Sequence, residues 1–280
     1  MSNLKDQIRQ FCSTYLLRLN TDLGQHFLVD QSILDQIVEA AKIQSNDHIV
    51  EIGPGIGVLT KELLQRAAKV TAIELDERMI PLMKEYVHSH LKAKSYQLKA
   101  IQENALNTAM PQDEYKIVAN IPYHITSPLL QHVFLESTSH PETLTLLIQK
   151  EVADRICDTK NAGLLTIIVA LFGKATKITD VPPKAFLPPP KVDSAVIHID
   201  AYAEPIADPD TIKQVMKLAK IGFSQKRKML RNSFGNACLP AGRFQGGLEL
   251  LSAASIDETR RPQTLSVEEW IALAKAHVQN

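Results

Sequence analysis

Three glycines and one glutamate have the spacing of a nucleotide-binding site. In the stretch IVEIGPGIGVLT, an apolar run leads into Gly53, Gly55 and Gly57, and a helical pattern follows. Because glycine has no Cβ, a ligand can approach this backbone closely. Glu74 follows about 20 residues later, where a carboxylate can accept hydrogen bonds from both hydroxyls of a ribose. The spacing is not the dinucleotide fingerprint GxGxxG, because Val58 stands at its last glycine, and no GK[ST] follows as in a P-loop. A nucleoside without a pyrophosphate is favoured, and S-adenosylmethionine fits better than NAD.

A second motif ends a later apolar run. In the stretch IVANIPYHITSP the run stops at Asn120, and Pro122 prevents further strand pairing. The Asn120 side-chain oxygen and the Ile121 carbonyl can each accept one N–H of an exocyclic aromatic amine, which aims the nitrogen lone pair at a sulfonium methyl group. Tyr123 can stack on the base, an interaction of about 1 to 3 kcal/mol, and Phe186 can close its opposite face. We predict that alignment and electrostatics carry the reaction, with Asn120, Ile121, Pro122, Tyr123 and Phe186 as the catalytic residues.

Short apolar runs that alternate with helical patterns predict the scaffold. HIVEI, KVTAIE, KIVAN and TLTLLI are apolar or β-branched, and a stretch with a helical pattern separates each from the next. This alternation favours an α/β fold with a parallel sheet covered on both faces, where ligands bind at the carboxyl ends of the strands. We predict an N-terminal arm (1–20), a cofactor-binding methyltransferase domain (21–203) and a helical RNA-binding domain (204–280).

Charge is balanced over the chain but uneven along it. The 280 residues include 31 Lys and Arg and 31 Asp and Glu, so no overall field attracts nucleic acid or an anionic membrane. However, no acidic residue lies between Lys213 and Leu248, a region that contains SQKRKMLRNSF. We predict a local RNA-binding cluster of Lys226, Arg227, Lys228 and Arg231.

The remaining composition indicates an intracellular protein without a metal. The three cysteines, Cys12, Cys157 and Cys238, have no paired spacing, which is typical of reduced thiols. The nine histidines show no metal-ligand spacing, so we predict no metal. The N-terminus is charged and no apolar run approaches about 18 residues, so we expect a cytoplasmic protein, and we expect a monomer.

Eight motifs follow one another in the order of a known family. They are LGQHFL (23–28), VEIGPGIGVLT, IELD (73–76), NIPYHITSPL, QKEVADRI (149–156), FLPPPKVDSAV (186–196), FSQKRKMLRNSF (223–234) and RRPQTLSVEEW (260–270). Together they resemble the ribosomal RNA adenine N6-dimethyltransferases, specifically the bacterial small-subunit enzymes. The resemblance implies a class I S-adenosylmethionine-dependent methyltransferase, with a Rossmann-like, seven-stranded, mostly parallel sheet whose last strand is antiparallel, and a small C-terminal helical domain.

The resemblance also implies a substrate and a set of cofactor contacts. The substrate would be two adjacent adenosines in a loop near the 3′ end of small-subunit (16S) ribosomal RNA within a 30S assembly intermediate, each methylated twice on N6, and no membrane would be involved. The target base must be flipped or unpaired, since stacking hides its amine. The residues expected at the cofactor are Gln25, His26, Leu28, Gly53, Gly55, Gly57, Glu74, Asn104 and Asn120.

Departures from the family pattern leave alternatives open. Asn104 stands where family members commonly carry Asp, His124 replaces a common Asn, and AGLLTI (162–167) replaces YGRLSV and so lacks its arginine. One alternative is the antibiotic-resistance type of large-subunit ribosomal RNA adenine methyltransferase, although FLPPPKVDSAV and FSQKRKMLRNSF argue against it. Another is a ribosome assembly factor for which methylation is secondary. An NAD-dependent oxidoreductase is disfavoured by the glycine spacing.

Overall fold

The structure, a computed structural model, divides the chain into two compact units. One comprises Met1–Ala153 and Thr176–Ala201, and the other comprises Asp154–Ala175 and Tyr202–Asn280. The residues that it describes are 3–17, 19, 24–91, 97–225, 227–235, 237, 239, 242 and 246–278, with only the main chain of 278.

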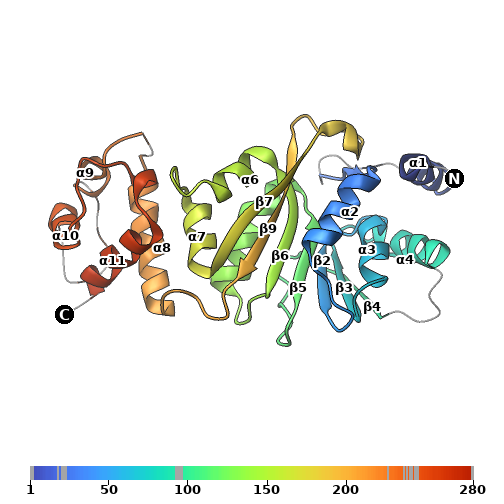
Figure 1. The fold of residues 1–280 in the computed structure, drawn as a ribbon, viewed down its shortest axis with the longest axis horizontal. Coiled ribbons are helices and arrows are strands. Elements are labelled where there is room, and N and C mark those ends of the chain that lie inside the picture. Colours follow the sequence, from blue (N-terminus) through green and yellow to red (C-terminus); the bar gives the residue numbers. More distant parts are fainter. Residues whose placement is uncertain are drawn as a thin grey trace. The chain divides into compact units, whose positions relative to one another are not determined.

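A seven-stranded sheet organises the first unit. Its order is β4-β3-β2-β5-β6-β9-β7 (Figure 1). Strands β2, β3, β4, β5 and β6 run parallel to one another, whereas β9 is antiparallel to β6. The seven-stranded, mostly parallel sheet with an antiparallel last strand is therefore confirmed. The strands are β2 (His48–Ile52), β3 (Lys69–Glu74), β4 (Leu98–Gln102), β5 (Lys116–Asn120), β6 (Thr143–Gln149), β7 (Gly173–Val181) and β9 (Ser194–Ala201).

Burial explains why these short runs form central strands. Every residue of β2 is buried, as expected for a parallel strand that is covered on both faces. Helix α2 begins after Asp30, whose side chain accepts a hydrogen bond from the Ser32 N–H, and it buries its apolar face. The helices after the strands are α3 (Val58–Leu64), α4 (Met79–His90), α5 (Thr126–Gln131) and α6 (Lys150–Cys157), and α2 spans Gln31–Ala40.

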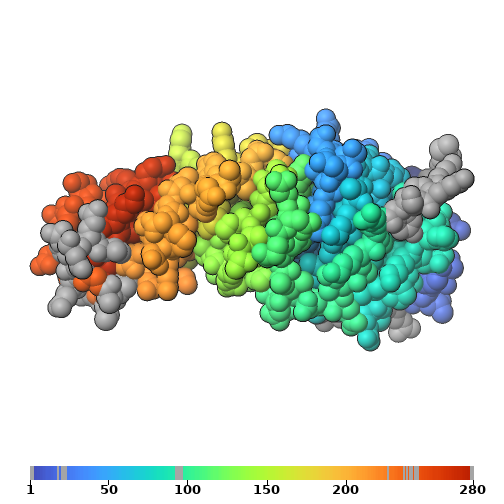
Figure 2. Space-filling view, turned by 90° about the horizontal axis from the view of Figure 1, so that it is seen from below, coloured from blue at the N-terminus to red at the C-terminus, as the bar shows by residue number. Residues whose placement is uncertain are grey.

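The N-terminal helix α1 (Leu4–Thr14) is amphipathic and packs on the first unit. Its buried side chains Leu4, Ile8 and Phe11 belong to the same apolar core as α2, α3 and α4. The ring of Phe11 meets that of Tyr86 on α4 edge-on, with centroids 5.2 Å apart. Figures 1 and 2 both show α1 beside α4.

The second unit is helical. Helix α7 is almost wholly apolar, with the sequence LLTIIVALF, and it packs against α8 and α11. Residues 154–175, which we expected in the methyltransferase domain, therefore cluster with the C-terminal helices. The helices are α7 (Leu164–Phe172), α8 (Pro209–Phe223), α9 (Leu230–Phe234), α10 (Gly247–Ala253), the short η5 (Pro262–Thr264) and α11 (Val267–Val278). Among the described residues, none of the helices has the length and apolarity needed to cross a bilayer.

Candidate active site

A cleft lies where three neighbouring strands end. Strands β3, β2 and β5 are adjacent and parallel, so Glu74, Gly53 and Asn120 at or just beyond their carboxyl ends meet at one edge of the sheet. The cleft has about 1060 Å³ of empty volume, which includes open solvent at its mouth. Its lining includes the predicted residues Gln25, His26, Leu28, Gly53, Gly55, Glu74, Asn104, Asn120 and Pro122.

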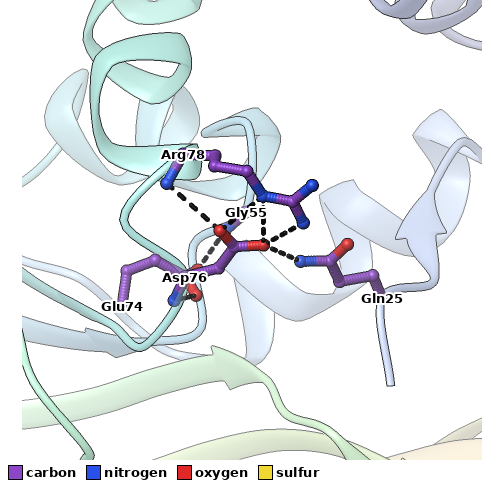
Figure 3. A network of polar contacts seen from close by, with 5 residues as sticks. All are labelled: Gln25, Gly55, Glu74, Asp76 and Arg78. Carbon is purple, nitrogen blue, oxygen red and sulfur yellow. Dashed lines mark hydrogen bonds and ion pairs between the residues drawn. The ribbon is translucent and has the colours of Figure 1, made fainter. Parts of the chain in front are cut away.

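The glycine loop fixes the carboxylate of Glu74. The main-chain N–H of Gly55 donates to Oε2 at 3.1 Å and that of Asp76 donates to Oε1 at 2.9 Å (Figure 3). Each carboxylate oxygen keeps a lone pair that can accept from a hydroxyl. Burial is the main cause that raises the pKa of Glu74, and the two main-chain hydrogen bonds oppose it. The geometry suits a ribose.

Asn120 has an oriented amide. Its Nδ2 donates to the main-chain carbonyl of His26 at 3.1 Å, so its Oδ1 faces away from that carbonyl and can accept from a ligand. The turn that follows is held by close packing, because a Cβ on Gly24 would lie 2.8 Å from Cβ of Pro122. Gly24 has a φ of 72°, which also favours glycine at this position.

Tyr123 is held in one plane by two neighbours. Its hydroxyl and the Oγ of Ser194 are 2.6 Å apart, and Ser194 is fully buried at the start of β9. Its ring lies nearly parallel to that of His26, at 16° with centroids 6.3 Å apart. The ring of His26 is fixed in turn, because its Nδ1 lies 2.8 Å from the carbonyl oxygen of Pro188 and donates to it.

Four predicted residues do not line the cleft. Gly57 has a φ of 90° and packs on α4, where a Cβ would lie 2.9 Å from Cγ of Met83. Ile121 is buried, and the role predicted for it uses only its main-chain carbonyl. Phe186 is 2% exposed in the core, where β8 (Phe186–Leu187) pairs with β1 (Phe27–Leu28). Tyr123 is half-buried beside the cleft.

Asn104 is engaged by its own loop. Its Oδ1 accepts a hydrogen bond from the N–H of Leu106 at 3.0 Å. The amide therefore presents nitrogen more readily than oxygen to a ligand, whereas an aspartate at this position would keep a second oxygen free.

The predicted RNA-binding cluster belongs to the second unit. Arg227, Lys228 and Arg231 are exposed, around the start of α9. Lys226 lies outside the described residues. Nothing in their geometry identifies a ligand, so their RNA contact stays a prediction.

Sequence reasoning missed several cleft residues, and three of them carry groups that a cofactor could use. Glu51 is 1% exposed, and its Oε2 has no hydrogen-bond partner among the described residues. Burial raises the pKa of Glu51 to about 8. Leu75 is 58% exposed beside Glu74 and offers an apolar surface. The carboxylate of Asp76 accepts hydrogen bonds from Gln25 and Arg78. The available signal was position: Glu51 precedes the glycine loop, and the other two follow Glu74.

Known proteins resemble the chain over nearly its whole length. The family model described as ribosomal RNA adenine dimethylase matches residues 16–273. The ribosomal RNA small subunit methyltransferase A of Dehalococcoides mccartyi is 38% identical over 285 aligned positions, which cover 99% of this chain and 95% of that protein. A crystal structure of a dimethyladenosine transferase from Plasmodium falciparum is 30% identical with a TM-score of 0.75, covering 89% and 96% of the two chains.

A further structure shares the fold. The crystal structure of the 23S rRNA methyltransferase ErmE is 24% identical with a TM-score of 0.68, and the match covers 90% of this chain and 100% of that chain. The class I methyltransferase fold predicted from the motifs is thereby confirmed. The chain belongs to the ribosomal RNA adenine dimethylase family of methyltransferases.

Proposed function

We propose that the chain uses S-adenosylmethionine to dimethylate N6 of two adjacent adenosines in a loop near the 3′ end of small-subunit (16S) ribosomal RNA, during assembly of the 30S subunit. The family description supports dimethylation of adenine in ribosomal RNA. The name of the Dehalococcoides mccartyi relative supports the small subunit. The observation that carries the proposal is the oriented amide of Asn120 at the same sheet edge as the carboxylate of Glu74.

The cleft residues fit the proposed cofactor. Glu74 would bind the ribose, and Leu75 would cover one face of the adenine ring. The carboxyl of Glu51, buried at the cleft wall, has an unpaired oxygen that could accept a hydrogen bond from the ammonium group at the methionine end of the molecule. When bound, S-adenosylmethionine supplies a methyl carbon that its sulfonium makes electrophilic.

The chain's own residues then orient the target amine. The Oδ1 of Asn120 accepts one N–H of the adenine amine, and the Ile121 carbonyl accepts the other. These two acceptors hold the nitrogen lone pair out of conjugation with the ring, and Tyr123 stacks on the base. Because the amine becomes strongly acidic once it is alkylated, its proton leaves to solvent without a dedicated base. Orientation supplies the rate enhancement.

Exposed cations of the second unit would hold the RNA backbone. Arg227, Lys228 and Arg231 can each neutralise a phosphate. Changing Arg231 to Glu should weaken RNA binding. It should also lower the number of counterions released on binding, measured from the salt dependence of the affinity, by about one. Lys99→Glu, at an exposed site on β4, is the matched charge reversal and should leave both unchanged.

One experiment tests the function. Purified protein is incubated with labelled S-adenosylmethionine and with separated ribosomal subunits that lack adenine dimethylation, and the modified adenosines are mapped by mass. We expect four methyl groups on two adjacent adenosines of the small subunit. Label in the large subunit alone would instead support the antibiotic-resistance type of activity. Absence of label from both subunits would remove the proposal.

The assembly-factor alternative requires a different measurement. Cells that carry the Asn120→Ala variant are compared with cells that lack the protein, and maturation of the small subunit is followed. Full maturation with the variant would mean that binding, and not methylation, is the main contribution of the protein.

A further inference from the structure

The segment formed by residues 24–28 touches three separate turns of the first unit. A Cβ on Gly24 would lie 2.8 Å from Pro122, and a Cβ on Gly55 would lie 2.8 Å from Cε1 of Phe27. The 24–28 segment therefore packs tightly on the turn after β5 and on the glycine loop. Gln25 makes the third connection, since its Nε2 donates to Oδ2 of Asp76 at 2.8 Å (Figure 3).

Asp76 is a well-anchored acceptor. Its side chain is 7% exposed and is paired with Arg78, whose Nη2 donates to Oδ2 at 2.6 Å and whose Nε donates to Oδ1 at 2.9 Å. The hydrogen bond from Arg78 is the main cause that lowers the pKa of Asp76 to about 2. The group is therefore ionised at any working pH, and a hydrogen bond to a charged acceptor is stronger than a neutral one.

The neighbour of Gln25 in the chain reaches the target side of the cleft. The main-chain carbonyl of His26 accepts from Nδ2 of Asn120 at 3.1 Å. This carbonyl fixes which end of the Asn120 side chain is nitrogen and which is oxygen. If the 24–28 segment shifts, the carbonyl moves with it and the Asn120 amide is free to rotate. Asp76 lies two residues after Glu74 and donates its main-chain N–H to the Glu74 carboxylate. Contacts therefore run from Glu74 on the cofactor side, through Asp76 and the 24–28 segment, to the target side.

We propose that Asp76 is a positioning residue that, through Gln25, holds the 24–28 segment so that the His26 carbonyl keeps the Oδ1 of Asn120 directed at the target amine. The inference rests on the proposed function for its effect on turnover. The position of the segment itself is a property of the protein alone, and it can be measured without cofactor or RNA.

The test removes the donor and the acceptor, singly and together. Gln25→Glu places a second carboxylate against Asp76 and replaces an attraction by a repulsion. Gln25→Ala and Asp76→Ala are combined in a double-mutant cycle, because Gln25 has lost this acceptor once Asp76 is replaced. The matched control is the pair Gln31 and Asp35 on α2, where Nε2 donates to Oδ1 at the same distance of 2.8 Å on an exposed surface.

Two readouts separate positioning from general stability. Amide hydrogen exchange of residues 24–29 in the free protein reports whether the 24–28 segment is held in place. Binding of S-adenosylmethionine by calorimetry and single-turnover methylation of small subunits report the site. We expect Gln25→Glu to raise exchange about tenfold or more and to slow turnover about tenfold. Gln25→Ala should add little to either effect in the Asp76→Ala background, and the same changes at positions 31 and 35 should alter neither exchange nor turnover.

Defined results would overturn the inference. Unchanged exchange in residues 24–29 for both Gln25→Glu and Gln25→Ala would show that the bond to Asp76 does not hold the segment. Loss of cofactor affinity with normal turnover, or fully additive losses of turnover for Gln25→Ala and Asp76→Ala, would show that Asp76 does not act on Asn120 through Gln25. If wild-type protein fails to methylate small subunits, the proposed function fails, while the exchange result still decides whether the segment is held.

Discussion

Replacing Asn120 by Ala separates alignment of the amine from binding of the cofactor. The change removes Oδ1, the proposed acceptor for the target amine, together with the hydrogen bond from Nδ2 to His26. Removing one preorganised hydrogen-bonding group at a reacting centre typically costs about 10²- to 10³-fold in turnover, or roughly 2.7 to 4 kcal/mol. An ordinary hydrogen bond contributes only about 0.5 to 1.5 kcal/mol, so cofactor affinity should fall about tenfold or less. Turnover should therefore fall at least ten times more than affinity.

The assay is single-turnover methylation of small subunits with labelled S-adenosylmethionine, with calorimetry for the dissociation constant. Asn107→Ala is the matched control, because Asn107 is an exposed asparagine that follows β4. Asn120→Asp is a second variant, since a carboxylate oxygen would face the His26 carbonyl about where Nδ2 lies now, at 3.1 Å. Two acceptors repel each other, so this variant should also lose turnover. An affinity loss that equals or exceeds the turnover loss in Asn120→Ala would refute the assigned role.

Three further outcomes follow from the cleft. Asn104→Asp should tighten S-adenosylmethionine binding about three- to tenfold in calorimetry, because one carboxylate oxygen can keep the Leu106 N–H while the other accepts from adenine. Ser194→Ala and Tyr123→Phe each break the same 2.6 Å hydrogen bond, so their losses in methylation should not add in a double-mutant cycle. Burial raises the pKa of Glu51 from 4.5 to about 8 in the folded chain, so the folded state holds a proton that the unfolded state loses. Wild-type stability should fall between these pH values by about 1.4 kcal/mol per pH unit, and denaturation of Glu51→Gln should lack this fall.

The elements of the fold could be predicted because their signals are local. Each apolar run with β-branched residues became a strand, and Gly53 to Glu74 share a short stretch of chain. Helix α7 was harder, since LLTIIVALF carries no polar face that would show which unit it joins. An all-apolar helix packs wherever tertiary partners surround it. Its partners, α8 and α11, lie later in the sequence.

The connections within the site could not be predicted because they are not local. The hydrogen bond between His26 and Asn120 spans 94 positions. That between Tyr123 and Ser194 spans 71 positions. A motif shows which side chains are present, but the direction of an amide or a ring depends on a partner from another strand or loop. Sequence therefore identified Asn120 and missed what orients it.

Phe186 shows how burial limits a role taken from a motif. At 2% exposure, its ring contributes to the core, and exposing such a side chain costs about 1.5 to 3 kcal/mol. Stacking on one base contributes about 1 to 3 kcal/mol. The stacking energy would therefore only offset the cost of exposing the Phe186 ring. Tyr123, by contrast, is half-buried and already fixed in its plane by Ser194 and His26. A base therefore finds Tyr123 ready to stack, whereas a contact with Phe186 requires the ring to leave the core that joins β8 to β1.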